Sequence, residues 1–256
     1  MRVELDVTQA VLLGPGEGER LGEHIVVKVE LPEISVNEVV RTGPFEGAGP
    51  HFHKEHVDVF YVLEGELEVI NGAETVRAGP GTSVVVPPGV VHGFRGPGDA
   101  RYLNIHAPDG SFIEYIRRIT GDGVRVDWDN YDVDEPQGPS GAIVAGPDGG
   151  ERLERPAGLA NTIRAETTEL SVLEMEFDER WEGVNPHHHD EHVDSFYVLE
   201  GEVEFLLGSE ANQVEAGTYF AAPRGVTHGF RPVGPARLLN LHAPDAGFAG
   251  RARGRS

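Results

Sequence analysis

The sequence predicts an all-β protein built from two similar domains in tandem. Its 256 residues leave room for two domains of ordinary size, each long enough to bury its own core. Its 34 glycines and 18 prolines, set against few long apolar runs, favour many short strands joined by turns over long helices. The third observation is an internal repeat that relates the two halves of the chain.

The repeat holds a constant offset of 136 residues. Segment 51–65, HFHKEHVDVFYVLEG, matches segment 187–201, HHHDEHVDSFYVLEG, at 12 of 15 positions. Segments 87–95 and 100–109 recur at the same offset. The stretch from 51 to 109 is therefore copied without insertion or deletion.

The copies also share a GPxxGER segment near their starts, at Gly14 and Gly146. We therefore expect an N-terminal domain over residues 1–120 and a C-terminal domain over residues 142–256. Residues 121–141 are rich in glycine, proline and aspartate, as expected of a linker that runs over the surface.

Local patterns within the first copy predict strands, a hairpin and one helix. Residues 59–62 and 67–70 are β-rich runs separated by Glu-Gly-Glu, which predicts a hairpin. Residues 83–86 form a β-branched run that ends at Pro87. Residues 111–119 carry one apolar stripe at helical spacing, so we expect a short helix that follows the first domain and packs against its outside.

Charge and composition exclude several classes of function. The net charge of −22 would repel phosphate backbones and anionic membrane surfaces, so we expect no nucleic-acid partner and no membrane partner. The chain has no cysteine, which leaves nitrogen and oxygen as the only metal ligands. The first residues are too acidic for a signal peptide, and no apolar run is long enough to span a bilayer, so we expect a cytoplasmic protein.

The histidines are retained in register between the two copies. Of twelve histidines, only His24 and His188 lack a counterpart. The matched pairs are His51/His187, His53/His189, His56/His192, His92/His228 and His106/His242. A lone histidine is usually a surface or core residue, but drift after a duplication would scatter such residues. Retention of the whole set indicates a task that each copy has or once had.

The spacing of these histidines favours a metal site. His-x-His on an extended segment places both imidazoles on one face of a sheet, where a group from another strand can complete the site. Three imidazoles and one carboxylate suit Mn, Fe, Co, Ni, Cu or Zn more than Mg or Ca. We expect up to two divalent transition-metal ions per chain. The predicted ligands are His51, His53, Asp58 and His92 in the first copy, and His187, His189, Asp194 and His228 in the second.

Both copies resemble the cupin superfamily through its two sequence motifs. The first motif, G-x5-H-x-H-x3or4-E-x6-G, resembles the segments that run from His51 to Gly65 and from His187 to Gly201. The second, G-x5-P-x-G-x2-H-x3-N, resembles the segments from Gly81 to His92 and from Gly217 to His228. The resemblance implies two tandem double-stranded β-helix barrels of the jelly-roll type, each with a metal inside near one mouth. In such a barrel, strand alternation points Phe60, Val62 and Phe94 into the interior together with the ligands. The same is expected of Phe196, Val198 and Phe230.

Three departures from the motifs leave the fourth ligand open. Aspartate replaces the usual glutamate, the leading glycine of the first motif is missing, and the final asparagine of the second motif is absent. Asp58 either binds the metal directly after a small backbone shift, binds it through a water molecule, or is replaced as the fourth ligand by His56. The same three alternatives apply to Asp194 and His192 in the second copy. We favour the aspartates. We expect His56, His192, His106 and His242 to lie next to the ligands and to support them without binding the metal. Asn104 and Asn240 are candidates to replace the missing asparagine.

The resemblance implies a function without identifying the substrate. A bicupin with a full ligand set in both halves most often suggests a metal-dependent dioxygenase of the quercetin dioxygenase kind, with Asp58 and Asp194 as catalytic bases. The alternatives are another cupin reaction, such as isomerisation or decarboxylation, and a non-catalytic ligand-binding or storage protein with a structural metal. We expect a small-molecule partner and either a monomer, as a pseudo-dimer, or a homodimer. The copies diverge at residues 83–86 against 219–222, so we also expect their pockets to differ.

Overall fold

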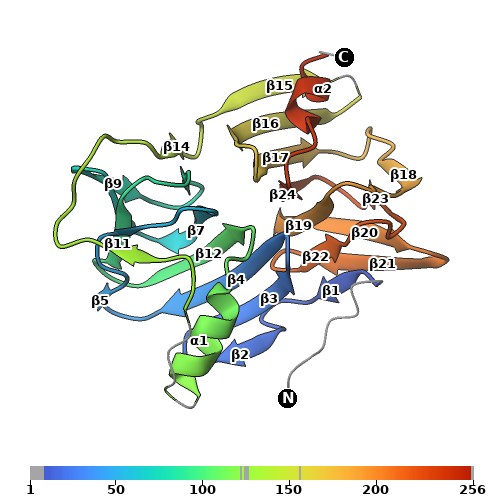
Figure 1. Cartoon of the computed structure of the whole chain (residues 1–256). Helices are drawn as coiled ribbons and strands as arrows, with labels where there is room; N and C mark the ends of the chain where they lie inside the picture. Colours follow the sequence, from blue (N-terminus) through green and yellow to red (C-terminus); the bar gives the residue numbers. More distant parts are fainter. Residues whose placement is uncertain (1–8, 122, 124–126, 156, 255–256) are drawn as a thin grey trace. The chain divides into compact units, whose positions relative to one another are not determined.

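The computed structural model describes residues 9–121, 123, 127–155 and 157–254. The chain divides into two compact units. One unit comprises Glu19–Gly149, and the other comprises Gly150–Ser256 together with Met1–Gly18. Strands dominate both units, as Figure 1 shows, so the predicted all-β class with two tandem barrels is confirmed.

The Glu19–Gly149 unit is a pair of antiparallel sheets. The larger sheet has the strand order β14-β10-β7-β12-β4-β3-β2, and the smaller has the order β13-β6-β11-β8-β9, with β5 beside β11. The strands are β2 (Glu19–Leu21), β3 (Ile25–Leu31), β4 (Ile34–Arg41), β5 (Phe45–Glu46), β6 (His51–Phe52), β7 (Val57–Gly65), β8 (Leu67–Asn71), β9 (Glu74–Ala78), β10 (Ser83–Val86), β11 (His92–Gly96), β12 (Ala100–Ala107), β13 (Tyr131–Asp132) and β14 (Ile143–Ala145).

The other unit repeats this arrangement. Its larger sheet has the order β1-β22-β19-β24-β17-β16-β15, and its smaller sheet has the order β18-β23-β20-β21. The strands are β1 (Val11–Leu13), β15 (Glu151–Arg155), β16 (Leu159–Glu166), β17 (Ser171–Phe177), β18 (Val184–His187), β19 (Val193–Glu200), β20 (Glu202–Leu207), β21 (Glu210–Glu215), β22 (Tyr219–Ala222), β23 (His228–Pro232) and β24 (Ala236–Ala243).

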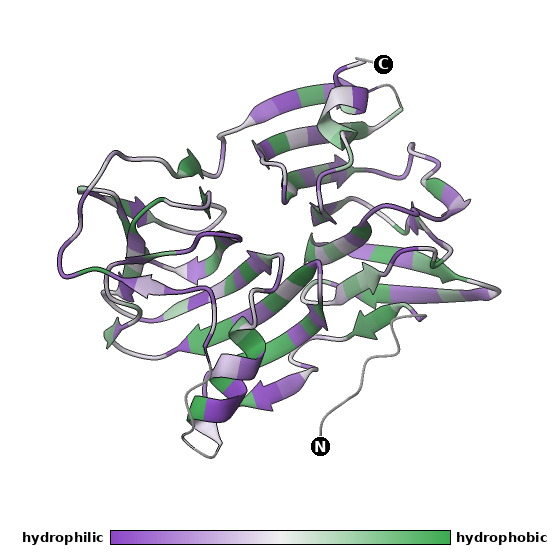
Figure 2. Cartoon of the chain, viewed as in Figure 1, coloured by the Kyte–Doolittle hydropathy of each residue, from purple (hydrophilic) through white to green (hydrophobic). Residues whose placement is uncertain are grey.

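The core of each unit lies between its two sheets. In the Glu19–Gly149 unit, Phe60 and Val62 of β7 pack with Val69 of β8 from the opposite sheet. In the other unit, Phe196 of β19 packs with Phe230 of β23. Side chains alternate between the two faces of a strand, and Figure 2 shows hydrophobic and hydrophilic residues alternating along many strands. Of these residues, Phe60, Val62, Phe196 and Phe230 are among those that the family resemblance predicted to face the interior.

The first strand of each copy belongs to the unit formed mainly by the other copy. β1 pairs with β22, and β14 pairs with β10, in both cases antiparallel. The two GPxxGER segments that follow these strands mark the points where the chain passes from one unit to the other. This division differs from the boundaries 1–120 and 142–256 expected from the repeat, which assigned each first strand to its own copy.

The hairpin predicted over residues 59–70 is wrong. β7 pairs with β10 and β12, whereas β8 pairs with β9 and β11, so the two runs lie in different sheets. Gly65 adopts a φ of 75° and lies against the backbone of Asp99, where a side chain would collide. The Glu-Gly-Glu segment therefore carries the chain from one sheet to the other instead of folding it back on itself.

Two short helices follow the last barrel strands. The predicted helix is confirmed as α1 (Phe112–Thr120), whose buried Ile113 packs against Leu21 and Val27. The second helix, α2 (Phe248–Ala252), was not expected; its Ala249 packs against Ile163 and Leu173. No helix among the described residues has the length and apolarity needed to cross a bilayer.

The exchanged strand gives a testable prediction for residue Leu12. Leu12 lies in β1 opposite Phe220 and packs on the core that contains Phe230. The substitution Leu12→Asp should cost roughly 2–4 kcal/mol of stability in this unit, because it removes apolar packing and places a charge there. Hydrogen exchange should accelerate at the amides of β22 and leave those of β10 unchanged. Val233→Asp, at an exposed position of the same unit, is the control. Unchanged exchange in β22 would contradict the assignment of β1.

Candidate metal centres

The predicted ligands of the first copy meet between the two sheets of the Glu19–Gly149 unit. His51 lies on β6 directly opposite His92 on β11, His53 follows β6, and Asp58 lies on β7 of the larger sheet. All four are buried. The His51 ring centroid lies 4.3 Å from that of His92 and 4.9 Å from that of His53. One ring nitrogen from each of the three histidines lies within 4.8 Å of the others.

Backbone carbonyls orient these imidazoles. The Nδ1 atom of His51 lies 2.7 Å from the carbonyl oxygen of Gly49, and that of His92 lies 3.0 Å from the carbonyl oxygen of Val90. Nδ1 of His53 contacts the carbonyl oxygen of Asp129. A neutral imidazole has one N–H donor and one lone pair, so a proton donated from Nδ1 to a carbonyl leaves the lone pair on Nε2.

The Nε2 lone pairs therefore face the space shared by the three rings. Burial lowers the pKa of His51 to about 4 and that of His53 to about 2, so both rings are neutral at neutral pH. Among the described residues, Nε2 of His53 and Nε2 of His92 have no hydrogen-bond partner. These two buried ring nitrogens therefore lie in the cluster without a hydrogen-bond partner among the described residues.

Asp58 adds a carboxylate to the same space. Its Oδ2 lies 3.3 Å from Nε2 of His92, and its Oδ1 accepts a hydrogen bond of 2.6 Å from Nδ2 of Asn104. His106 Nε2 lies 3.5 Å from Oδ1. Burial alone would raise the pKa of Asp58, but the imidazoles of His106 and His92 lower it below its usual range, so the group is an ionised carboxylate.

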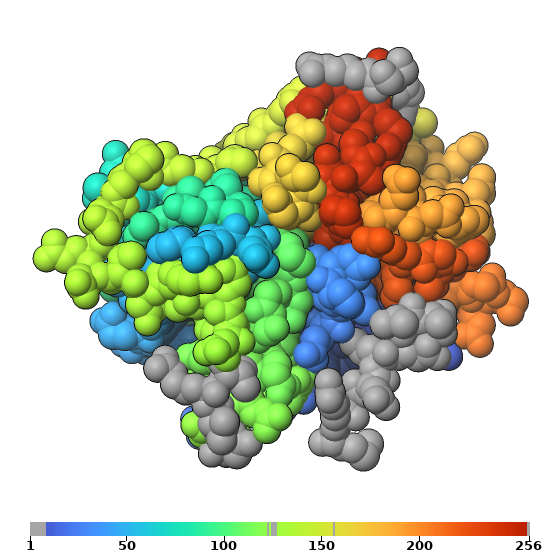
Figure 3. All heavy atoms as spheres, in the orientation of Figure 1, coloured from blue at the N-terminus to red at the C-terminus, as the bar shows by residue number. Residues whose placement is uncertain are grey.

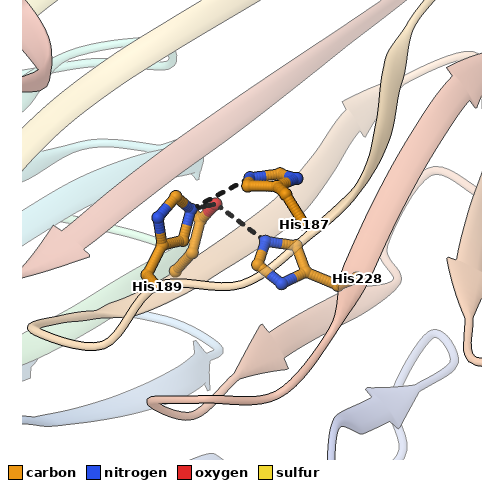
Figure 4. Close-up of side chains that lie close together, drawn as sticks. His187, His189 and His228 are labelled. Atoms are coloured by element: carbon orange, nitrogen blue, oxygen red, sulfur yellow. Dashed lines mark hydrogen bonds and ion pairs between the residues drawn. The ribbon is translucent and has the colours of Figure 1, made fainter.

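The predicted ligands of the second copy also meet, and here the aspartate belongs to the same group of ligand atoms as the three histidines, whereas Asp58 in the first copy does not. One ligand atom each from His187, His189, Asp194 and His228 lies within 4.8 Å of the others. Figure 4 shows the three imidazoles turned toward one another. Carbonyl oxygens at 3.0 Å hold Nδ1 of His187 and Nδ1 of His228, as in the first copy. Nε2 of His187 lies 3.1 Å from Nε2 of His189.

Asp194 is held like its counterpart. Its Oδ2 lies 3.2 Å from Nε2 of His228, and its Oδ1 accepts a 2.6 Å hydrogen bond from Asn240. Burial would raise the pKa of Asp194, but His242 and hydrogen bonds from His189 and His228 lower it well below its usual value. Asn104 and Asn240 thus each bind the aspartate of their cluster, although they lie on a later strand than the asparagine of the family motif.

The histidines expected to support the ligands, His56 and His106 in the first copy and His192 and His242 in the second, lie beside the two clusters. The ring of His56 stacks on that of His53, with centroids 3.8 Å apart, and its Nδ1 lies 3.0 Å from Oδ2 of Asp129. Ring nitrogens of His53, His56 and His106 also lie within 4.8 Å of one another. In the second copy His192 lies beside both His189 and His242, with ring centroids 4.1 Å and 4.9 Å away.

Two residues of the expected linker cover the first cluster and were missed by the sequence analysis. The carboxylate of Asp129 accepts hydrogen bonds from the backbone N–H groups of Lys54 and Glu55. The ring of Trp128 lies 5.2 Å from that of His53. Strand β13, which follows, pairs with β6, and Figure 3 shows the yellow-green segment on the surface of this unit. The linker thus contributes to the environment of the first cluster.

A pocket of about 530 Å³ adjoins the first cluster. His51, Asp58, Asn104 and His106 line its buried part. Aromatic and polar side chains form much of the rest: Asn37, Arg41, Phe45, Phe94, Tyr102, Phe112, Tyr115 and Trp128. Its volume lies in the range of pockets that bind small organic molecules.

The donor set of each cluster suits a divalent transition metal. Neutral imidazoles that donate their second N–H to a backbone carbonyl, together with an ionised carboxylate, are the usual protein ligands of such ions. Nε2 of His92 lies 3.3 Å from a carboxylate oxygen of Asp58, so a cation between the two atoms would be close to both a nitrogen and an oxygen ligand. The residues present therefore fit a metal ion in each barrel.

The clusters and the fold agree with comparisons to known proteins. A family model described as the cupin domain matches residues 38–106 and 173–242. No curated protein matches the sequence. Among solved structures, a salicylate 1,2-dioxygenase from Pseudoaminobacter salicylatoxidans, with gentisate adducts, aligns with a TM-score of 0.65 and 14% identity, over 96% of this chain and 84% of that one.

Two further structures share the fold. A putative glyoxylate induced protein from Pseudomonas aeruginosa aligns with a TM-score of 0.62 and 17% identity, over 91% of this chain and 88% of that one. A mutant of Bacillus subtilis oxalate decarboxylase aligns with a TM-score of 0.60 and 13% identity, over 92% and 77%. At these identities the likeness concerns the fold. The family match covers both repeats and more than half of the chain, and the chain therefore belongs to the cupin family, as a protein with two cupin domains.

Proposed function

We propose that each barrel binds one divalent transition metal and that the protein is a metal-dependent dioxygenase-type enzyme for a small organic substrate. The observation that carries the metal assignment is the clustering of ring nitrogens from three histidines within 4.8 Å of one another in each barrel, with a buried, ionised aspartate beside His92 and beside His228. The proposed ligands are His51, His53, Asp58 and His92 in the Glu19–Gly149 unit, and His187, His189, Asp194 and His228 in the other unit.

The chain's own residues prepare the site for such an ion. When bound, a metal of this class supplies Lewis acidity toward a substrate oxygen at positions that protein ligands leave open. The carbonyls of Gly49 and Val90 fix the tautomers of two ligand histidines, and the Asn104 amide orients the Asp58 carboxylate. The lowered pKa of Asp58 makes this carboxylate a weak proton acceptor, so it supports the ligand role more than the role of general base.

The pocket beside the first cluster supports a reaction on a bound small molecule. A purely structural metal is enclosed by protein ligands, whereas His51 and Asp58 line a pocket of about 530 Å³. The aromatic walls suit a planar substrate, such as a phenol or an enol. The salicylate dioxygenase and oxalate decarboxylase of the same fold are enzymes on small organic molecules, and decarboxylation is the second candidate reaction.

Metal analysis tests the two-site proposal. Protein loaded with metal and freed of excess ion should hold two ions per chain. The double substitution His51→Ala and His53→Ala should leave one, because the second cluster has its own complete ligand set. The matched double substitution His187→Ala and His189→Ala should also leave one. Loss of both ions from either variant would contradict independent sites.

The fourth ligand of the first cluster is tested by two single substitutions. Asp58→Asn should weaken metal binding in this cluster by at least about 10-fold, because it removes the anionic oxygen next to His92. His56→Ala should change the affinity little, since His56 stacks on His53 and bonds to Asp129. Competition with a chelator, in a background that lacks His187 and His189, measures the affinity. If His56→Ala empties the cluster and Asp58→Asn does not, the ligand is His56.

Oxygen consumption tests the reaction class. Metal-loaded protein is offered a panel of small phenols and enols in an oxygen-electrode cell. We expect substrate-dependent uptake of O2 and, with ¹⁸O2, two labelled oxygen atoms in the product. The His51→Ala, His53→Ala variant should show no uptake. Release of CO2 or formation of an isomer without O2 uptake would replace the dioxygenase proposal with one of the alternative cupin reactions.

A further inference from the structure

We infer that the two barrels divide their tasks: the Glu19–Gly149 barrel binds a small planar organic carboxylate through Arg41, and the interior of the other barrel is filled. This inference rests on the proposed function, since it names the substrate class of the first metal cluster. It is carried by a comparison of the two copies at equivalent positions, and by the absence of an ion-pair partner for Arg41 among the described residues.

A row of polar groups leads away from the first metal cluster. On β4 and β12 the cross-strand pairs are Asn37 with Asn104, Val39 with Tyr102, and Arg41 with Ala100. Alternation along a strand puts the side chains of residues 37, 39 and 41 on one face, and those of 102 and 104 face the same interior. Asn37, Arg41, Tyr102 and Asn104 all line the pocket. The pocket therefore extends from the cluster to a guanidinium.

The equivalent row in the other barrel is apolar except for Asn240. The same register pairs Leu173 with Asn240, Met175 with Leu238, and Phe177 with Ala236. At the offset of 136 residues, Leu173 replaces Asn37, Phe177 replaces Arg41 and Leu238 replaces Tyr102. A methionine replaces valine at position 175, and tryptophan replaces phenylalanine at position 181.

These replacements pack the interior of the second barrel. Phe177 is buried, with its ring centroid 4.8 Å from that of Trp181, and Trp181 lies 5.5 Å from Phe230. Met175, Phe177 and Leu238 belong to one continuous apolar cluster. Large side chains thus occupy the positions that face the pocket in the first barrel, and the polar group that remains in this row, Asn240, donates to Asp194.

Arg41 carries the charge that selects the ligand. Its guanidinium lies 4.8 Å from the centre of the Phe45 ring, and among the described residues no carboxylate lies within ion-pair distance of it. On the neighbouring strand, by contrast, Arg101 is ion-paired with both Glu38 and Glu64. An unpaired guanidinium in an aromatic pocket of a chain with net charge −22 is a specific anion site, because its planar fork matches a carboxylate.

The carboxylates that line the pocket do not prevent an anion from binding at Arg41. Asp58 is one of them and is a proposed ligand of the metal ion. Glu23, Glu46 and Asp132 also line the pocket, but they are exposed, where solvent screens their repulsion of an anion. Aromatic side chains from Phe45, Phe94 and Trp128 provide apolar walls for a planar body. The ligand class is therefore a flat molecule with one carboxylate directed to Arg41.

Benzoate and its neutral isostere benzamide test the assignment. The chain has two tryptophans, so Trp181→Phe leaves Trp128, which lines the pocket, as the only fluorescent indole. In this background, loaded with Zn²⁺, benzoate should change the emission saturably and bind about 10-fold more tightly than benzamide, the factor expected for one charge-assisted contact. Arg41→Gln should remove this preference while benzamide binding persists, which shows that the pocket is still folded. Arg77→Gln, which removes an exposed arginine of the same unit, should keep the preference.

The reciprocal reporter tests the division of tasks. Trp128→Phe leaves Trp181 in the interior of the other barrel, and benzoate should not change its emission. Equal affinities for benzoate and benzamide, a preference that survives Arg41→Gln, or a saturable response from Trp181 would each overturn the inference. Metal content is measured on every sample. If protein that cannot bind metal still prefers benzoate to benzamide, and this preference depends on Arg41, the proposed function is wrong but the carboxylate site at Arg41 is supported.

Discussion

A buried carboxylate surrounded by imidazoles is the constraint on which each barrel depends. An ionised carboxylate in a protein interior is strongly unfavourable unless it is paired, and Asp58 and Asp194 are both buried. One oxygen of each accepts a hydrogen bond from an asparagine amide, while the other lies 3.3 Å from Nε2 of His92 in one barrel and 3.2 Å from Nε2 of His228 in the other. A cation bound at this point would offset the charge of the buried carboxylate.

The fold makes this arrangement possible because the proposed ligands come from both sheets. Asp58 lies on β7 of the larger sheet, whereas His51 and His92 lie on β6 and β11 of the smaller one. The other barrel repeats the pattern with Asp194 on β19 opposite His187 and His228 on β18 and β23. A metal ion in either cluster would join the two sheets across the barrel. The same jelly-roll topology that separates β7 from β8 therefore positions the ligands.

Duplication has kept the clusters alike and changed their surroundings. The first cluster is buried, with Trp128 and Asp129 over it and a polar pocket beside it. The side chain of His189 in the second cluster is 23% exposed, and the barrel interior behind it is apolar. Two sites with one ligand set can thus differ in access, ligand chemistry and task.

The sequence predicted those features that depend on short, repeated patterns. The His-x-His segments, the distal histidines and the strand that ends at Pro87 were all located, because ligand spacing and strand alternation act over a few residues. Features that depend on long-range contacts were not found. The pairing of β1 with β22 joins residues about two hundred positions apart, and Asp129 meets Lys54 across 75 positions. The difference at Arg41 and Phe177 lies outside the copied stretch, where only the cross-strand register shows that the two positions correspond.

Anomalous diffraction from crystals of metal-loaded protein, recorded at the absorption edge of the bound metal, tests the central claim most directly. We expect one anomalous peak in each barrel. In the Glu19–Gly149 unit the peak should lie ~2.0–2.2 Å from Nε2 of His51, His53 and His92 and from a carboxylate oxygen of Asp58. A peak among His53, His56 and His106 instead, or a barrel without a peak at full metal loading, would contradict the account.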